Sequence, residues 1–184
     1  MERGRLRRQD RAMDEEEAWA LLERAFCGRL GTVDEEGWPY VVPQLFVVDG
    51  RELYFHGTAA YGQTRRNIEA DPRVCFEVDE PGPVFPYGEE SPCETSVGFE
   101  SVILFGTCRI VTSREEKIRF YERLMAKYAD PAWERPAVWP RLEATTVYAV
   151  RVEKITGKRR PVQVAERWRH LFPQTPAPGA RRRR

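Results

Sequence analysis

The chain has 184 residues, 41% of them hydrophobic, which is enough for one substantial core and fits one main domain better than two. Thirty basic and twenty-nine acidic residues leave a formal charge of +1, and four of the positive charges are the terminal Arg181 to Arg184. Without that tail the charge is −3, which argues against a dedicated nucleic-acid binder. No apolar run approaches the roughly 20 residues of a membrane span, so a cytoplasmic protein without a membrane partner is expected.

The expected main domain covers residues 1–160, and residues 161–184 form a C-terminal extension. A short helix is predicted over residues 162–171, followed by disorder from residue 173, where periodic apolar residues are lacking. The four cysteines, Cys27, Cys75, Cys93 and Cys108, show no C-x-x-C pairing, and only two histidines occur. Neither a disulfide nor a metal site is therefore predicted.

Taken in chain order, the first elements are a helix and a strand pair. Acidic residues 14–17 begin a helix that carries Trp19, Leu22 and Phe26 at helical spacing. Residues 27–33 read as a strand, residues 34–37 as its turn, and residues 38–48 as a long second strand. Asp49-Gly50 is typical of a tight hairpin turn, and the return strand starts at Leu53 and ends at His56-Gly57. A helix over Gly62 to Ala70 is closed by Asp71-Pro72.

The second half of the sequence predicts three further strands and another helix. Residues 72–79 form a strand, residues 80–92 an irregular connection, and residues 95–112 a strand with a bulge at Gly106. Ser113 caps the next helix, residues 129–140 form a loop, and residues 145–155 form the last strand. About six strands, three helices and no βαβ alternation favour a mainly β fold, an antiparallel β-barrel with peripheral helices. No G-x-G-x-x-G or Walker A motif is present.

Two local features indicate a ligand site. Thr64, Arg65 and Arg66 sit near the first turn of the Gly62–Ala70 helix, where an anion such as phosphate would satisfy both the arginines and the free N–H groups. The alternative is a solvated helix with two surface arginines. Pro43 interrupts the long strand, so the strand lies at an edge or a bulge and leaves backbone groups for a ligand; the alternative is an ordinary edge-strand proline.

Four segments carry a family resemblance: GRLGTVDEEGWPYVVPQLFVVDGRELYFHG, GQTRRNIEADPRVCFEV, FESVILFGTCRIV and ITGKRR. Together they resemble the pyridoxamine 5'-phosphate oxidase-like flavin-binding family, and within it the Nim nitroimidazole-resistance branch. The resemblance runs from about residue 7 to residue 160, with element order and spacing kept. It implies a six-stranded antiparallel split β-barrel of the FMN-binding type, and a homodimer with two FMN sites at the subunit interface.

The resemblance also implies which residues bind FMN. The residues matching the strand along the isoalloxazine ring are Val42, Pro43 and Gln44. Those matching the strand end near the ribityl and phosphate groups are His56, Gly57 and Thr58. The matching start of the phosphate-binding helix is Gly62, Gln63 and Thr64. Relatives have a lysine at the position of Thr64, so Arg65 or Arg66 would have to supply the cation.

Two further segments match family positions. Ser101 and Val102 match a pair that lies close to the flavin in relatives, many of which have an arginine just before it. Here that residue is Glu100, which would disfavour an anionic ligand or a reduced, anionic flavin. Lys158 matches the shared Thr-Gly-Lys ending, either as a phosphate contact or as a surface residue.

His56 resembles the proposed active-site histidine of the Nim branch. Its imidazole would relay protons while reduced flavin passes electrons to a nitro group or another small acceptor. The alternative is that it bonds the backbone or helps to hold the cofactor. The leading hypothesis is an FMN-dependent, nitroreductase-like oxidoreductase, and pyridoxamine phosphate oxidation is disfavoured. The other hypotheses are a non-catalytic flavin or haem binder, for storage or sensing, and a nucleic-acid binder that acts through its arginine tail.

Overall fold

The computed structural model describes residues 3–86, 95–133, 139 and 141–160. Eight strands occur in this part of the chain: β1 (Ala12–Met13), β2 (Gly28–Val33), β3 (Pro39–Gln44), β4 (Phe46–Asp49), β5 (Glu52–Thr58), β6 (Arg73–Pro86), β7 (Thr95–Ile110) and β8 (Thr145–Arg160). The helices are α1 (Glu15–Arg24), α2 (Gln63–Ala70) and α3 (Arg114–Tyr128), with short 3-10 turns at Gln9–Arg11 and Leu142–Ala144.

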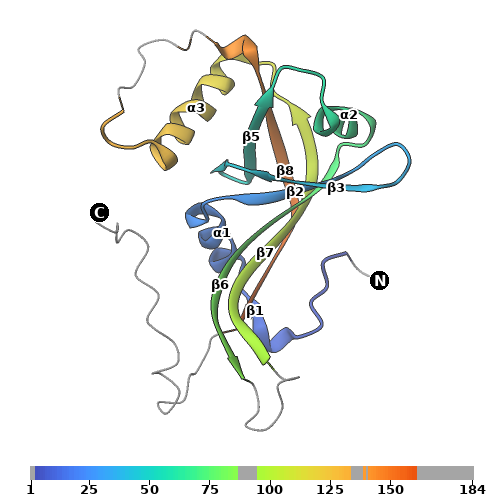
Figure 1. Cartoon of the computed structure of the whole chain (residues 1–184), viewed down its shortest axis with the longest axis vertical. Helices are drawn as coiled ribbons and strands as arrows, with labels where there is room; N and C mark the ends of the chain where they lie inside the picture. Colours follow the sequence, from blue (N-terminus) through green and yellow to red (C-terminus); the bar gives the residue numbers. More distant parts are fainter. Residues whose placement is uncertain (1–2, 87–94, 134–138, 140, 161–184) are drawn as a thin grey trace.

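The strands form one antiparallel sheet in the order β3-β2-β6-β7-β8-β5-β4, and β1 pairs with β8 outside this path. Figure 1 shows β6, β7 and β8 as long neighbouring strands, with the β2–β3 hairpin crossing them and α2 beside β5. The prediction of a mainly β, antiparallel split barrel is confirmed. The six expected strands are obtained when β3 and β4 count as one strand and the two-residue β1 is set aside.

The predicted strand over residues 38–48 is divided at Leu45. Its first part, β3, pairs with β2, and its second part, β4, pairs with β5. Because β3 and β4 lie at opposite ends of the strand order, the chain passes at Leu45 from one end of the sheet to the other. The hairpin after β4 follows the prediction: Asp49 pairs with Glu52, and Gly50 takes the positive φ of 63° that this turn requires.

The predicted irregular connection over residues 80–92 is wrong for its first part, since β6 continues to Pro86. Prolines are tolerated there because β6 pairs with β2 only at Cys75 to Glu77, so further along its length one edge of β6 needs no N–H donor. A register shift between Pro81 and Val84 accommodates the extra residues. Similarly, β8 extends five residues beyond the predicted end at Ile155.

Two glycines allow close backbone packing at the long strands. A Cβ on Gly106 would stand 2.3 Å from the carbonyl oxygen of Arg151, and the β7–β8 register shifts at this position, which confirms the predicted bulge. A Cβ on Gly157 would stand 2.8 Å from Cβ of Met13. The glycine therefore lets β1 settle directly on β8.

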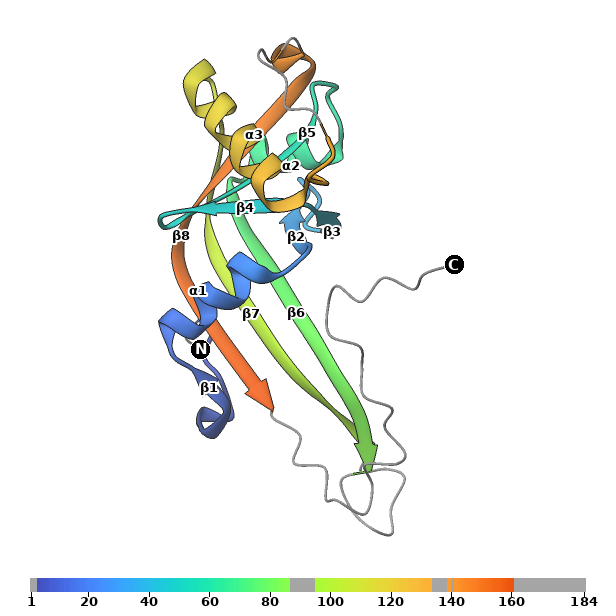
Figure 2. The same cartoon turned by 90° about the vertical axis from the view of Figure 1, so that its left-hand side faces the viewer.

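Two hydrophobic clusters stabilise the barrel. The larger one fills its interior and includes Leu21 and Leu22 of α1, which packs across β7 and β8 (Figure 2). The smaller one lies under α3, where Phe120 is 2% exposed and packs with Val147 and Tyr54. Helices α1 and α3 thus cover different parts of the sheet.

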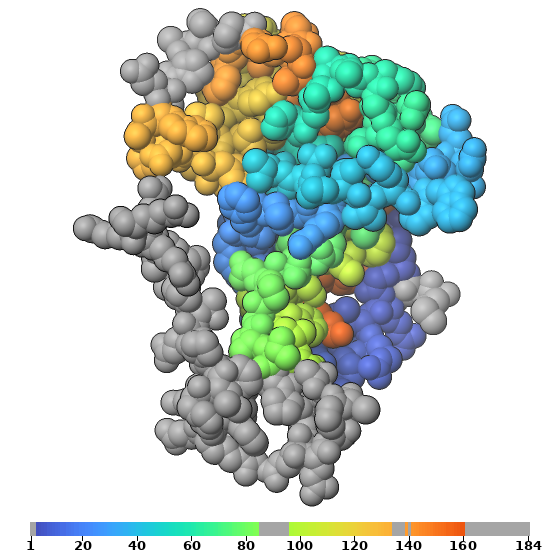
Figure 3. All heavy atoms as spheres, viewed as in Figure 1, coloured from blue at the N-terminus to red at the C-terminus, as the bar shows by residue number. Residues whose placement is uncertain are grey.

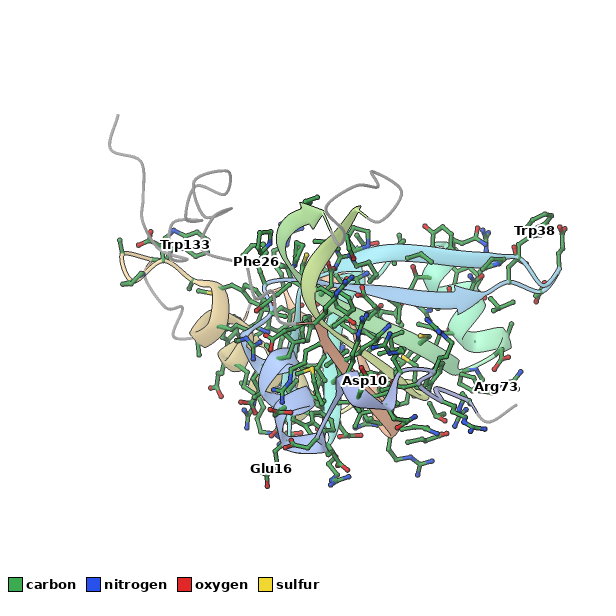
Figure 4. The ribbon with its side chains drawn as sticks, turned by 90° about the horizontal axis from the view of Figure 1, so that it is seen from below. Asp10, Glu16, Phe26, Trp38, Arg73 and Trp133 are labelled. Atoms are coloured by element: carbon green, nitrogen blue, oxygen red, sulfur yellow. The ribbon has the colours of Figure 1, made fainter. Side chains whose placement is uncertain are left out.

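Phe26 departs from its predicted role in the first helix. Helix α1 ends at Arg24, and the Phe26 side chain is 73% exposed. In the view from below it lies between the labelled Trp133 and the middle of the molecule (Figure 4). It is therefore no part of the buried face of α1.

Several predictions fall outside the described residues, namely the helix over 162–171, the disordered segment from 173 and any role of Cys93. Cys27, Cys75 and Cys108 are free thiols. Among the helices of the described ranges, none is long and apolar enough to cross a bilayer. Within those same ranges, His, Cys, Asp and Glu side chains form no group of three or more that could hold a metal ion.

Candidate functional site

Helix α2 begins without a cap. Its N-cap residue, Gly62, has no side chain, and a Cβ placed there would meet nothing within 4 Å. The helix geometry leaves the N–H groups of Gln63, Thr64 and Arg65 without intrahelical acceptors, and no side chain of the described residues bonds to them as a cap. The start of α2 is therefore an open, positively polarised group of donors.

A cavity of about 230 Å³ lies directly in front of this helix start. It is lined by residues from β3, β5, the start of α2 and β8, namely Tyr40, Gln44, Phe55, His56, Gly57, Thr58, Ala60, Gly62, Gln63, Thr64, Arg65 and Tyr148. Figure 3 shows α2 and the segment before it at the molecular surface, above the β2–β3 hairpin. The fold thus brings together eight of the residues predicted from the sequence.

The other predicted residues lie elsewhere. Val42 points inward and packs against the core, and Pro43 is exposed on the opposite face of β3. On β7, Val102 is fully buried. Ser101 pairs with Lys158, whose ammonium stands 5.5 Å from the ring centre of Phe99. None of these residues lines the cavity of about 230 Å³.

The imidazole of His56 faces α3. Along β5, Leu53 and Phe55 point into the barrel interior, and Tyr54 points to the cluster under α3, so the alternation places His56 on the α3 side. Its ring centre lies 5.6 Å from the rings of both Phe120 and Tyr121. The backbone of His56, more than its ring, therefore borders the cavity.

One nitrogen of this histidine is left unsatisfied. Nδ1 of His56 is buried, and it is the one buried side-chain nitrogen or oxygen of the described residues that lacks a hydrogen-bond partner. Burial lowers the pKa of the imidazole below its usual value, because the charged form is poorly solvated there. His56 is therefore neutral at physiological pH.

The two arginines of α2 are used differently. Arg65 lines the cavity, donates from Nε to Oε1 of Glu69 at 2.8 Å and stacks 5.4 Å from the ring centre of Tyr61. Arg66 donates to Oε1 of Gln63 at 3.2 Å and borders a second cavity, of about 550 Å³. That second cavity is lined in part by four acidic residues, Asp34, Glu35, Glu36 and Glu69. Of the two arginines, Arg65 is thus the one placed to replace the missing lysine.

A buried polar chain fixes the position of α2. Asn67 is 2% exposed and donates from Nδ2 to Oγ1 of Thr32 on β2 at 2.9 Å. Gln63 donates from Nε2 to Oδ1 of Asn67 at 3.3 Å. These bonds tie the first turn of the helix to the barrel, so the open donors are held in place.

The lining includes aromatic residues that the sequence reasoning missed. Tyr40 lies on the same face of β3 as Gln44, so strand alternation alone was enough to find it. Tyr148 of β8 pairs with Phe55 of β5, and their rings stack 4.9 Å apart at 13°. Finding Tyr148 required knowing that β5 and β8 are neighbours, which no local pattern indicates.

The outer face of the sheet beside this site carries exposed apolar residues. Val33, Val41 and Ile103 are 44%, 62% and 38% exposed. In the strand register, Val41 of β3 pairs with Gly31 of β2, and Gly31 pairs with Cys75 of β6. This face therefore runs over several strands, and the next row carries an ion pair between Arg29 and Glu77 at 3.5 Å.

An antiparallel split barrel with an uncapped helix beside a cavity defines the structural class. A family model described as pyridoxamine 5'-phosphate oxidase matches residues 14–159, and the chain belongs to this family. No curated protein matches the chain in sequence.

Solved structures share the fold. A flavocytochrome from Azotobacter vinelandii is 23% identical, with a TM-score of 0.71 over 93% of this chain and 79% of that one. A candidate 5-nitroimidazole antibiotic resistance protein from Bacteroides thetaiotaomicron is 24% identical, with a TM-score of 0.68 over 80% and 85%. An FAD and heme binding protein from Mycobacterium smegmatis is 20% identical, with a TM-score of 0.68 over 86% and 78%.

Proposed function

We propose that the chain is a flavoprotein that binds FMN with the phosphate at the start of α2. The observation that carries this proposal is the uncapped turn at Gly62 to Arg65, which opens into the cavity and offers three backbone donors, the Thr64 hydroxyl and the Arg65 guanidinium. A phosphate dianion suits such a set, since it accepts several hydrogen bonds and favours the positive helix end. Two structural neighbours are FAD-binding proteins by name, which supports a flavin cofactor.

The size of the cavity favours a flavin site that two subunits share. At about 230 Å³ it is smaller than the roughly 300–1,000 Å³ usual for a ligand pocket, so it would hold the phosphate and ribityl part of FMN. The ring would then lie along the free edge of β3, beyond Gln44 and outside this cavity. A second subunit would complete the enclosure.

We infer a homodimer formed through the outer face of the sheet. Exposed Val33 and Val41 lie there, on the face of β2 and β3 that points away from Gln44. Ser101 and Lys158 share the outward face with Ile103, because alternate residues of β7 point the same way and Ser101 pairs with Lys158. A partner docked on this face would bring its own Ser101 and Lys158 towards the flavin, which explains why they lie away from the cavity of their own chain.

In this proposal bound FMN supplies the electron transfer of an oxidoreductase that reduces a small acceptor. The chain holds the phosphate at α2 and orients the cofactor along β3. His56 acts by shaping the strand end at Gly57 and Thr58, since its ring packs against α3. Proton transfer by the imidazole would need a rotated side chain.

The visible absorption spectrum of the freshly purified protein tests the cofactor. Yellow protein that releases FMN on heating, identified by its mass, supports the proposal. A colourless protein that takes up no added FMN would overturn it, and a haem spectrum would favour the haem-binding alternative. Oxidation of a reduced nicotinamide with candidate acceptors then separates an enzyme, which turns over, from a binder that holds FMN without turnover.

A further inference from the structure

Three side chains form a compact cluster between the two cavities: Arg65 lines the cavity of about 230 Å³, and Tyr61 and Glu69 line the cavity of about 550 Å³. Arg65 and Glu69 are one helical turn apart on α2, with 32% and 37% of their side chains exposed. Besides its stacking on Arg65, Tyr61 hydrogen-bonds to the Glu69 carboxylate. The guanidinium is thus held from two sides by groups of its own chain.

Only part of the guanidinium is occupied by these contacts. Arg65 uses Nε towards Glu69, and within the described residues its two Nη groups make no hydrogen bond. An arginine has five N–H donors in a planar fork that matches the oxygens of a phosphate. The free edge of the fork can therefore bind an anion while Nε stays on Glu69.

Glu69 opposes the anion that Arg65 would bind. Hydrogen bonds from Arg65 and Tyr61 lower the pKa of the Glu69 carboxyl, so it is ionised at neutral pH. Its negative charge offsets that of Arg65, and it would repel a phosphate bound within a few ångströms. The same carboxylate borders the second, acidic cavity, so negative charge lies on the far side of Arg65 as well.

We propose that Glu69 orients Arg65 towards a phosphomonoester and at the same time lowers the affinity of the site for that ligand. This inference rests on the proposed function, because it assigns the phosphate of FMN to Arg65. Glu69 itself touches no ligand and acts through Arg65. Tyr61 supports it by holding the guanidinium plane.

The test compares FMN with riboflavin, which lacks the phosphate. In Glu69→Gln the amide oxygen still accepts from Nε, but the charge is gone, and we expect FMN to bind about fivefold more tightly, as for an exposed ion pair. Riboflavin affinity should stay within about twofold. Adding Arg65→Met should cancel the gain. Glu36→Gln removes the same charge from the neighbouring cavity, without contact to Arg65, and should leave both affinities unchanged.

Some results would overturn this inference. FMN affinity that is unchanged or weaker in Glu69→Gln contradicts it, as does an equal gain for FMN and riboflavin. If the protein binds no flavin, inorganic phosphate replaces it as the probe, followed through the Nε–Hε NMR signal of Arg65. A signal that responds to phosphate more strongly in Glu69→Gln keeps the inference while the flavin proposal fails. No response in either protein overturns both.

Discussion

Helices α2 and α3 both border β5 but begin in opposite ways. At α3 the Ser113 hydroxyl accepts the N–H of Glu116 at 3.3 Å, and the Glu116 carboxylate accepts from Tyr54 at 2.9 Å and from Arg109 at 2.6 Å. At α2 the cap is Gly62, and the donors behind it face a cavity. One helix start satisfies its polar groups internally, whereas the other leaves them for a ligand. The predictions below test this difference.

The largest loss of stability is expected from a substitution in the buried cluster under α3. Phe120→Ala removes a side chain that is 2% exposed and should lower the free energy of unfolding by about 3–5 kcal/mol. Phe26→Ala, at a ring that is 73% exposed, should cost less than about 0.5 kcal/mol. Urea unfolding measures both. Similar losses for the two variants would show that α3 does not bury Phe120 as described.

A capping side chain on α2 should close its open start. Gly62→Asp places a carboxylate on the free N–H groups, where it should stabilise the helix but compete with phosphate, so FMN affinity should fall by about tenfold or more. Gly62→Ala is the control, because its Cβ meets no atom within 4 Å and brings no charge. Calorimetric titration with FMN measures the effect. If Gly62→Asp binds FMN as tightly as Gly62→Ala, the phosphate lies elsewhere.

Removing the cap of α3 should affect stability alone. Ser113→Ala loses the hydroxyl that accepts from Glu116, which should cost about 1 kcal/mol. FMN affinity should not change, because α3 contributes no residue to the cavity lining. Urea unfolding and FMN titration of the same sample check both statements. A loss of FMN binding larger than the loss of stability explains would link α3 to the ligand.

The smallest expected effect is the contribution of His56 to the pH dependence of the free energy of unfolding. Burial lowers the pKa of His56 in the folded protein, so the unfolded chain takes up the proton first as the pH falls. The stability that neutral His56 contributes is complete above the unfolded pKa of about 6.5 and is lost as the pH falls towards the lower folded pKa. His56→Phe keeps an aromatic ring beside Phe120 and should show a flatter profile. Urea unfolding between about pH 7.5 and 5 compares the two, and parallel profiles would contradict the buried, neutral imidazole.

Local sequence signals were sufficient for much of this fold. Asp49-Gly50 predicted the β4–β5 turn, Asp71-Pro72 the end of α2, and Gly106 the bulge in β7. These features depend on the backbone preferences of a few adjacent residues. The extension of β6 through Pro81 and Pro83 was missed, because proline is tolerated only when the neighbouring edge is free, and that depends on the sheet order.

The candidate site was predictable in part. Gln44, His56 and Thr64 were found through a resemblance that covers most of the chain, and they border one cavity. Whether the His56 ring faces that cavity depends on which side of β5 is covered by α3. This is a matter of tertiary packing, which the local sequence does not reveal. The contribution of Tyr148 depends in the same way on the pairing of β5 with β8.

The proposed function depends on the open start of α2 receiving the phosphate of FMN. Parallel calorimetric titrations of the purified, cofactor-free protein with FMN and with riboflavin test it most directly. We expect FMN to bind more tightly than riboflavin by at least about tenfold, because only FMN engages the α2 donors and Arg65. Equal affinities for the two compounds would contradict it.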